Sequence, residues 1–284
     1  MSLLRVEDTH FPKNSHFKIG DQLLDLKHPR IMGILNVSTD SFYAPSRKME
    51  QKFLLETAEK MIADGADILD IGGYSTRPGA AHIESTIELD RVKNTVDSIR
   101  KEFPKVIVSV DTFRGCVAEA AIEHGANMIN DISGLRFDPE LKKVVAHYRI
   151  PYILMHSRGT VDTMHAPYVY DHIVRDVVSA LATSIQDLRD LGVHDILIDP
   201  GFGFSKTVDQ NYELLQGLAD LHLLECPILV GFSRKSMIWK KLGITPEEAL
   251  NGTSVLNTYA LMNRCSIFRV HDVKEMKEII DLLS

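Results

Sequence analysis

Hydrophobic residues along the chain fall into short unbroken runs, separated by longer segments in which they recur every three or four positions. The short runs do not alternate with polar residues and are too short for helices, so they predict strands buried on both faces of a parallel sheet. The eight predicted strands are Ile31–Leu35, Ile68–Ile71, Val106–Val110, Met128–Ile129, Tyr152–Met155, Ile196–Ile198, Ile228–Val230 and Ile267–Phe268.

The longer segments have helical periodicity, and several end at a glycine, as helices often do. The predicted helices are Phe53–Ala63, Glu84–Glu102, Val117–His124, Pro139–His147, His172–Leu191, Val208–Ala219, Pro246–Met262 and Val273–Leu283. Strands and helices that alternate eight times predict an α/β fold, a (β/α)8 TIM barrel. A doubly wound sheet is the alternative if Met128–Ile129 is not a strand.

The N-terminal part has a different pattern. Residues 16–26 read as two short strands that turn at Gly20-Asp21, which predicts a β-hairpin before the barrel. We therefore expect one domain over residues 1–284, with residues 1–29 as an N-terminal hairpin extension. A chain of 284 residues is an ordinary length for a single barrel domain.

Composition narrows the classes of partner. With 32 basic and 39 acidic residues the formal net charge is −7, which argues against a nucleic-acid or acidic-membrane ligand and favours small-molecule substrates. No stretch approaches the roughly 18 apolar residues of a membrane span, and no signal peptide is recognisable. The three cysteines are far apart and suit a reducing compartment, so we expect a cytoplasmic protein.

Nearly every predicted strand is followed directly by polar residues. These are Asn36, Gly72-Gly73, Asp111, Asn130-Asp131, His156, Asp199, Ser233-Arg234-Lys235, and Arg269 with His271. In a parallel barrel such positions meet at one mouth, where barrel enzymes have their active sites. Helix capping is the alternative, and we favour it for Asp131, Ser133 and Asp272. Capping does not explain Lys235 or Arg269, because neither side chain has an acceptor.

Asp111, Asn130 and Asp199 would give this mouth an acceptor-rich pocket. Such a pocket suits a flat heterocycle with adjacent N–H donors. Metal ligation is the competing role for paired carboxylates, but no His-x-x-x-His or His-Glu-x-x-His motif accompanies them.

Arg234, Lys235, Arg269 and His271 gather positive charge on the last two strands, where barrels often bind phosphate. Two or three charge-assisted hydrogen bonds would hold a diphosphate. The alternative is that these cations only neutralise acidic neighbours. Residues 201–207 are no P-loop, because Pro200 and Ser205 stand where that motif needs glycine.

Eight segments together closely resemble the dihydropteroate synthase family. They are Met32–Phe42, Gly72–Ala80, Ser109–Thr112, Ile129–Gly134, Leu154–Gly159, Asp199–Phe204, Gly231–Ser236 and Arg269–Asp272. The resemblance implies a barrel that is commonly a homodimer and is the sulfonamide target. It also implies the folate-pathway reaction that joins 6-hydroxymethyl-7,8-dihydropterin diphosphate to p-aminobenzoate and releases pyrophosphate.

The resemblance also implies residue roles. The pterin is expected against Asp111, Asn130, Asp199 and Lys235, with Met155 and Phe204 as apolar walls. The diphosphate is expected on Arg269, His271 and Asn36, with Mg2+ bridging Asn36 and the phosphates. The expected frame of p-aminobenzoate is Thr76, Arg77, Pro78 and Ser236. The residues implied as catalytic are Asn36, Arg77, Lys235, Arg269 and His271.

Three positions depart from the family pattern. Ala44 replaces the second acid of the first loop, Tyr74 replaces a frequent Glu, and Ser157 stands where Met is common. The role of the first loop therefore stays unassigned. Two alternative functions remain at this point: a pterin-binding methyltransferase domain, and a paralogue that binds pterin without turnover.

Overall fold

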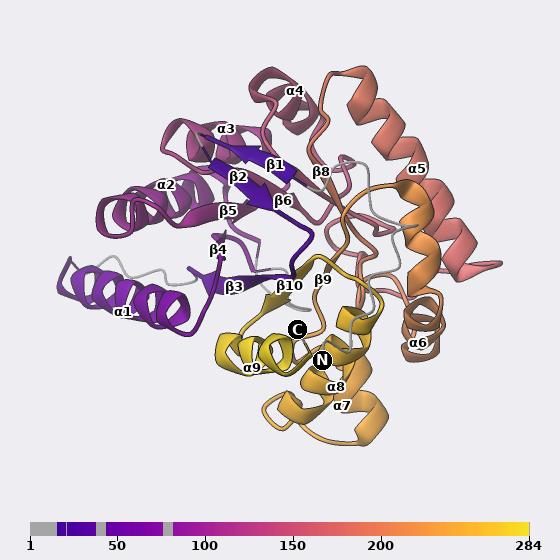
Figure 1. Ribbon diagram of the computed structural model, residues 1–284. Coiled ribbons are helices and arrows are strands. Elements are labelled where there is room, and N and C mark those ends of the chain that lie inside the picture. Colours follow the sequence, from indigo (N-terminus) through magenta and orange to yellow (C-terminus); the bar gives the residue numbers. More distant parts are fainter. Residues whose placement is uncertain (1–15, 21, 38–43, 76–81, 284) are drawn as a thin grey trace.

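The central element of the chain is an eight-stranded parallel sheet (Figure 1). The computed structural model describes residues 16–20, 22–37, 44–75 and 82–283, apart from the side chains of residues 44–48. In chain order the strands are β3 (Arg30–Asn36), β4 (Ile68–Gly72), β5 (Ile107–Asp111), β6 (Met128–Asp131), β7 (Tyr152–Met155), β8 (Ile196–Asp199), β9 (Leu229–Val230) and β10 (Ile267–Val270).

The sheet closes on itself. Its strands are ordered β8-β7-β6-β5-β4-β3-β10-β9, and a parallel bridge between Ile198 and Ile228 joins the two outer strands. The backbone N–H of Ile198 also donates to the Pro227 carbonyl at 3.0 Å. The predicted (β/α)8 barrel is confirmed, and Met128 and Ile129 do lie in a strand, contrary to the doubly wound alternative.

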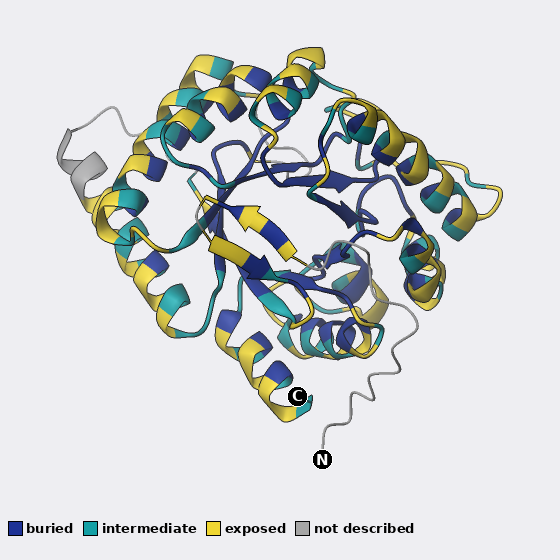
Figure 2. Ribbon diagram, turned by 45° about the horizontal axis from the view of Figure 1, so that its top comes forward, coloured by how far each residue is buried: buried dark blue, intermediate teal, exposed yellow. Residues whose placement is uncertain are grey.

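Helices surround the barrel, and their exposed residues lie on the outside (Figure 2). They are α1 (Ala44–Ala63), α2 (Ser85–Glu102), α3 (Gly115–Glu123), α4 (Pro139–Tyr148), α5 (Ile173–Asp190), α6 (Val208–Gln216), α7 (Ser236–Leu242), α8 (Leu250–Met262) and α9 (Val273–Leu283), with a 3-10 helix at Leu218–Leu224. The short helix α7 is not among the predicted elements, and α8 begins later than the expected Pro246.

Helix α6 ends earlier than predicted because of Gly217. A Cβ at that position would lie 2.5 Å from a methyl carbon of Val174 on α5, so only glycine allows this close approach. The N-terminus of α6 has a capping box formed by Thr207 and Gln210. Local sequence therefore sets where α6 begins, while packing against α5 determines where it ends.

The expected helix caps at Asp131 and Ser133 are corrected by the structure. The Asp131 carboxylate accepts the backbone N–H groups of Ser133 and Leu135, each at 2.7 Å, and stabilises the turn after β6. The cap of α4 is Asp138, which accepts from the Glu140 N–H. Asp131 is too far before α4 to reach its free N–H groups, so the turn uses its oxygens instead.

The N-terminal hairpin consists of β1 (His16–Ile19) and β2 (Gln22–Asp25), as predicted. It lies over the end of the barrel where the strands begin (Figures 1 and 2). One apolar cluster joins the hairpin to the barrel interior: Phe17, Ile19, Leu24, Leu26, Met32, Ile68, Met128, Ile153, Leu197, Leu229 and Ile267. Burial of these side chains closes that end of the barrel.

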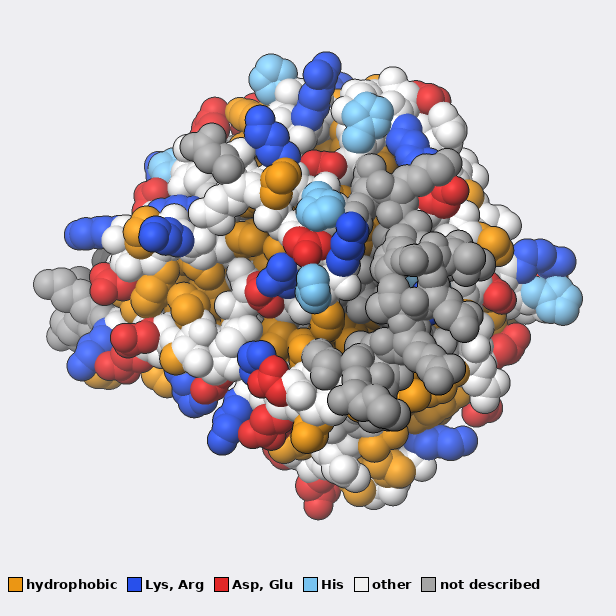
Figure 3. Space-filling view, viewed as in Figure 1, with side chains coloured by type: hydrophobic (Ala, Val, Ile, Leu, Met, Phe, Trp, Pro, Cys, Tyr) orange, Lys and Arg blue, Asp and Glu red, His pale blue; other side chains and the backbone are white. Residues whose placement is uncertain are grey.

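Charged side chains of both signs are interspersed on the face shown in Figure 3. On the hairpin, His28 lies 2.9 Å from Asp25, and nearby Arg30 pairs with Asp67 at 3.0 Å. No helix in the described ranges is both long and apolar enough to cross a bilayer.

Candidate functional site

An ion-pair network lies inside the mouth of the barrel, on strands β4, β5 and β10. Arg269 donates through Nε to Asp70 Oδ2 at 2.6 Å and through Nη2 to Asp111 Oδ2 at 2.8 Å. Asn130 on β6 donates through Nδ2 to the same Asp70 oxygen at 3.0 Å. Asp111, Asn130 and Arg269 therefore meet as predicted, around an acid that the sequence analysis did not single out.

Burial controls the protonation of Asp111. It raises the pKa of this carboxyl to about 7; the charge of Arg269 opposes the rise, and the charge of Asp70 adds to it. A buried carboxyl with a raised pKa beside specific charged partners is a candidate for a functional site.

A second group at the mouth comes from the loop after β8. Asp199 is buried, and its Oδ1 accepts the Gly201 N–H at 2.7 Å. Lys235 donates to the Phe202 carbonyl at 2.5 Å, and its Nζ lies 4.9 Å from the centre of the Phe204 ring. These contacts place an acid, a cation and an aromatic face together.

The two groups share one electrostatic environment. Burial lowers the pKa of Lys235 to about 8, against the attraction of Asp199, and the charge of Arg269 lowers it further. Burial raises the pKa of Asp199, while the charges of Lys235, Lys206 and Arg269 oppose that rise. Asp199, Lys235 and Arg269 are thus close enough to influence one another electrostatically.

Behind this loop lies Lys206, a buried cation that the sequence analysis passed over. Its Nζ donates to the carbonyls of Gly201 at 2.9 Å and Phe204 at 3.1 Å, and lies 3.2 Å from His156 Nδ1. Burial lowers the pKa of Lys206 to about 7 and that of His156 to about 2. The imidazole is therefore neutral and accepts from Lys206, and the lysine stabilises the loop that carries Phe204.

The predicted cationic cluster is only partly assembled. Arg234 forms two hydrogen bonds with Asp272, at 2.7 and 3.2 Å. Asp272 directly precedes α9 and its carbonyl accepts the Met276 N–H, so it stands at the helix start while its side chain pairs with Arg234. His271 Nδ1 lies 2.9 Å from Ser233 Oγ, which also accepts the His271 backbone N–H at 3.3 Å. The alternative, neutralisation by acidic neighbours, therefore describes Arg234, and Arg269 is likewise paired with two acids, Asp70 and Asp111.

The remaining predicted residues fall into three sets. Asn36 is exposed at the end of β3, and Ser236 is the first residue of α7. Met155 and Phe204 belong to one buried apolar cluster. Thr76, Arg77 and Pro78 lie outside the described residues, as does the side chain of Ala44.

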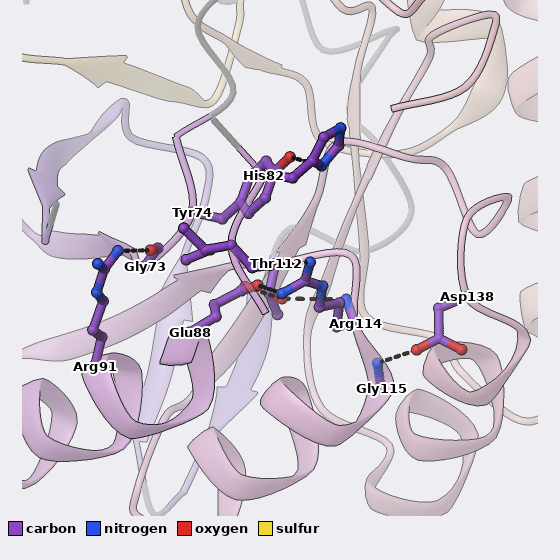
Figure 4. Close-up of polar contacts among 10 residues, drawn as sticks. Gly73, Tyr74, His82, Glu88, Arg91, Thr112, Arg114, Gly115 and Asp138 are labelled. Carbon is purple, nitrogen blue, oxygen red and sulfur yellow. Dashed lines mark hydrogen bonds and ion pairs between the residues drawn. The ribbon is translucent and has the colours of Figure 1, made fainter. Parts of the chain in front are cut away.

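Residues on both sides of positions 76–81 are held by hydrogen bonds (Figure 4). The Tyr74 hydroxyl lies 2.7 Å from His82 Nδ1, and His82 Nε2 lies 2.6 Å from Asp162. Arg114 pairs with the fully buried Glu88 at 2.8 Å and donates to the Ile83 carbonyl at 2.8 Å. Tyr74, which departs from the family pattern, thus has a defined partner.

Two functional residues, Asp70 and Lys206, were missed for different reasons. Asp70 lies inside the apolar run Ile68–Ile71, and a carboxylate within a fully buried strand is itself the signal, since such a charge must be paired. Lys206 was set aside together with the rejected P-loop motif. The residues around Lys206 give no comparable sign of burial, because a lysine in a loop is normally exposed.

Comparison with known proteins agrees with this geometry. A family model described as "Pterin binding enzyme" matches residues 32–271. The chain is 40% identical to a dihydropteroate synthase of Streptococcus pyogenes over 94% of this chain and 98% of the relative. It is 41% identical to the dihydropteroate synthase of Escherichia coli over 90% of each chain.

Solved structures show the same likeness. A Yersinia pestis dihydropteroate synthase in complex with a sulfonamide drug superposes with a TM-score of 0.87 at 39% identity, covering 94% of this chain and 98% of that one. A Xanthomonas albilineans dihydropteroate synthase with 4-aminobenzoic acid has a TM-score of 0.86 at 35% identity, covering 94% and 96%.

The barrel and its polar mouth therefore define a pterin-binding enzyme. Within that class the chain belongs to the dihydropteroate synthase family, which consists of transferases of folate biosynthesis. The resemblance found in the sequence motifs is confirmed, and the methyltransferase alternative is set aside.

Proposed function

We propose that the chain joins 6-hydroxymethyl-7,8-dihydropterin diphosphate to p-aminobenzoate, with release of pyrophosphate, by means of the mouth residues described above. The observation that carries this proposal is the meeting of Asp111, Asn130 and Arg269 in one network beside Asp199 and Lys235. An acceptor-rich surface and a cationic one are thus adjacent, as a heterocycle with an attached diphosphate requires.

The pterin ring would bind against Asp111, Asn130, Asp199 and Lys235. Asp199 keeps Oδ2 for the N–H donors of the ring while Oδ1 accepts from Gly201. Met155 and Phe204 would provide the apolar walls, and they already pack in one cluster. The ring would be held by its hydrogen-bonding edge and its flat faces together.

The diphosphate would bind to Arg269, His271 and Asn36. Arg269 uses Nε and Nη2 for its carboxylate partners, which leaves Nη1 as a donor for an anion. Thr76, Arg77, Pro78 and Ser236 would frame p-aminobenzoate. These assignments follow the family pattern, position by position.

Asn36 would be the protein ligand of Mg2+. In the described part of the chain no three His, Cys, Asp or Glu side chains gather as a metal site, and Asn36 would supply one amide oxygen. That fits an ion held mainly by substrate phosphates and water, which is usual for Mg2+. When bound, Mg2+ would offset negative charge on the departing pyrophosphate.

The reaction would be a substitution at the pterin methylene carbon. Arg269 and His271 would stabilise the leaving pyrophosphate, and the carboxylates of Asp111 and Asp199 would lie near the positive charge that develops on the ring. The arylamine nitrogen is a neutral nucleophile at pH 7, so the residues around it need only orient it. Positioning would therefore supply most of the rate enhancement.

The decisive experiment is incubation with the pterin diphosphate, p-aminobenzoate and Mg2+. Formation of dihydropteroate and pyrophosphate in equal amounts is the expected result. Binding of the pterin without either product would instead identify the non-catalytic paralogue.

A homodimer in the cytoplasm is part of the proposal. Val255, Tyr259 and Met262 follow one face of α8, and 58%, 39% and 64% of these residues are exposed. We expect light scattering to give twice the mass of one chain, and Val255→Glu to give a monomer. Leu282→Glu on α9, where 80% of the residue is exposed, is the control that should stay dimeric.

A reducing cytoplasm suits three free cysteines.

A further inference from the structure

Asp70 is a fully buried carboxylate in the middle of strand β4. Its neighbours along the strand, Leu69 and Ile71, are also fully buried and pack toward the helices. Taking a carboxylate out of water costs several kcal/mol unless partners offset the loss, so a residue kept at this position requires a reason.

The partner of Asp70 is Arg269. Its guanidinium is always protonated and donates to Asp70 Oδ2 at 2.6 Å, while a second edge nitrogen contacts Asp111. A guanidinium that bridges two carboxylates from adjacent strands has a fixed plane. Because a guanidinium only donates, Asp70 Oδ2 acts as a hydrogen-bond acceptor.

An acceptor at this position determines how the Asn130 amide is oriented. The oxygen and nitrogen of an amide are nearly equal in size, so only hydrogen-bond partners distinguish its two orientations. Because Asp70 Oδ2 is an acceptor, the nitrogen of Asn130 must face it, at 3.0 Å. The amide oxygen and the second N–H of Asn130 then have defined positions for a ligand.

We propose that Asp70 is a positioning residue of the pterin pocket, which orients the Asn130 amide and is itself held by its ion pair with Arg269. The inference rests on the proposed function, because it assigns Asn130 to the pterin. It adds a residue that touches no substrate, yet determines which donor and which acceptor the pocket presents.

The test is Asp70→Asn, which preserves shape and the capacity for hydrogen bonding but can both donate and accept. The Asn130 amide then loses its single orientation. We expect the Kd of 6-hydroxymethyl-7,8-dihydropterin, measured by calorimetry, to rise by about 10- to 100-fold, as for the loss of a hydrogen bond to a charged group. The KM of p-aminobenzoate should change less than about twofold, because that substrate does not contact Asn130.

Ser109→Ala is the matched control. Ser109 is paired with Asp70 across β4 and β5, is equally buried, and its hydroxyl has no hydrogen-bond partner among the described residues. Its removal should leave the pterin Kd within about twofold of the original. An equal loss of affinity in both variants would show a general packing effect and overturn the proposal.

A double-mutant cycle tests whether Asp70 acts through Asn130. On an Asn130→Ala background, Asp70→Asn should weaken pterin binding much less than it does alone, because there is no amide left to orient. If the two substitutions weaken pterin binding independently, so that the fold-changes in Kd multiply in the double variant, the mechanism is contradicted. Binding stoichiometry counts the folded sites, so a partly unfolded variant still yields a valid Kd.

A crystal structure of the unmutated chain with bound dihydropterin tests the same proposal without any variant. Asn130 Nδ2 should stay on Asp70 while its oxygen or second N–H meets the ring. A direct hydrogen bond between the pterin ring and Asp70 would overturn the positioning role. The two proposals fail differently: if the unmutated chain binds no dihydropterin, the proposed function is wrong. If it binds and Asp70→Asn binds equally well, only this inference is wrong.

Discussion

The two ends of the barrel are built from the same strands, yet they contain opposite kinds of side chain. Where the strands begin, the inward residues are apolar and the hairpin covers them, with Phe17 fully buried. Where the strands end, Asp70, Asp111 and Arg269 form ion pairs. One end provides stability and the other provides binding, as is general for such barrels.

Along a strand, the inward-facing side chains change from apolar to charged within two residues. Alternate side chains of a strand point to the same side, so Ile68 and Asp70 both point into the barrel, as do Leu197 and Asp199. A hydrophobic layer therefore lies directly beneath a charged one. This barrel therefore separates the residues that stabilise the fold from those of the candidate site by layer.

The largest effect is expected from Arg269→Ala in the charged layer. The change removes a cation proposed to meet the diphosphate and leaves Asp70 and Asp111 buried without it. We expect kcat/KM for the pterin diphosphate to fall by about 100- to 1000-fold, and the free energy of unfolding by about 3–5 kcal/mol. Steady-state kinetics per folded molecule measure kcat/KM, and urea unfolding measures the free energy of unfolding. Near-normal turnover contradicts the assignment.

Phe17→Ala probes the hydrophobic layer. Loss of a buried ring from the hairpin should lower the free energy of unfolding by about 3–5 kcal/mol. The mouth is at the other end of the strands, so kcat/KM per folded molecule should stay within about twofold at a temperature well below the melting point. A large change in kcat/KM would show that the two layers are coupled after all.

The charged layer should respond to pH through Lys235. Since burial lowers the pKa of Lys235 to about 8, dihydropterin affinity should fall by about tenfold between pH 7 and pH 9 as the amine loses its proton. Lys235→Arg keeps its charge, so its affinity should not show this decline. The same decline in both proteins would assign the titration to another group.

Stability should respond to the same proton in the opposite direction. The folded pKa of Lys235 lies below its ordinary value of 10.5, so the unfolded chain binds the proton more tightly. Between pH 8 and 10.5 the contribution of this residue to the free energy of unfolding therefore rises with pH. Urea unfolding of the original chain and Lys235→Arg measures the difference.

The smallest effect is expected from Tyr74→Phe at the rim of the mouth. The ring keeps its contact with Phe113, in which the two ring centroids lie 5.3 Å apart, but it loses the hydrogen bond to His82. One such bond contributes about 0.5–1.5 kcal/mol, so the KM of p-aminobenzoate should rise less than about tenfold while the dihydropterin Kd is unchanged. Kinetics with each substrate varied in turn check this, and weaker pterin binding would contradict it.

Much of the fold could be predicted from local patterns. The eight apolar runs identify the strands because both faces of a barrel strand are buried. The hairpin followed from alternation around Gly20, and the position of polar residues after each strand indicated the mouth. Helix α7 was missed because Ser236–Leu242 is too short to show a helical period.

The candidate site was predicted less completely, because its partnerships join distant residues. Nothing near Arg234 in the chain shows that it pairs with Asp272, while Arg269 pairs with Asp70 and Asp111. Those choices depend on the direction in which each side chain leaves its strand or loop. Spacing along the chain does not contain that information.

The sequence by itself determined the barrel, the end that carries the chemistry, and the family, since these depend on periodicity and on motifs read in order. Only the tertiary structure decided which charges neutralise one another, why Asp70 and Lys206 can be buried, and how the Asn130 amide is oriented. The physical reason is that a buried charge or amide is defined by partners within hydrogen-bonding distance, and folding brings those partners together from far apart in the chain.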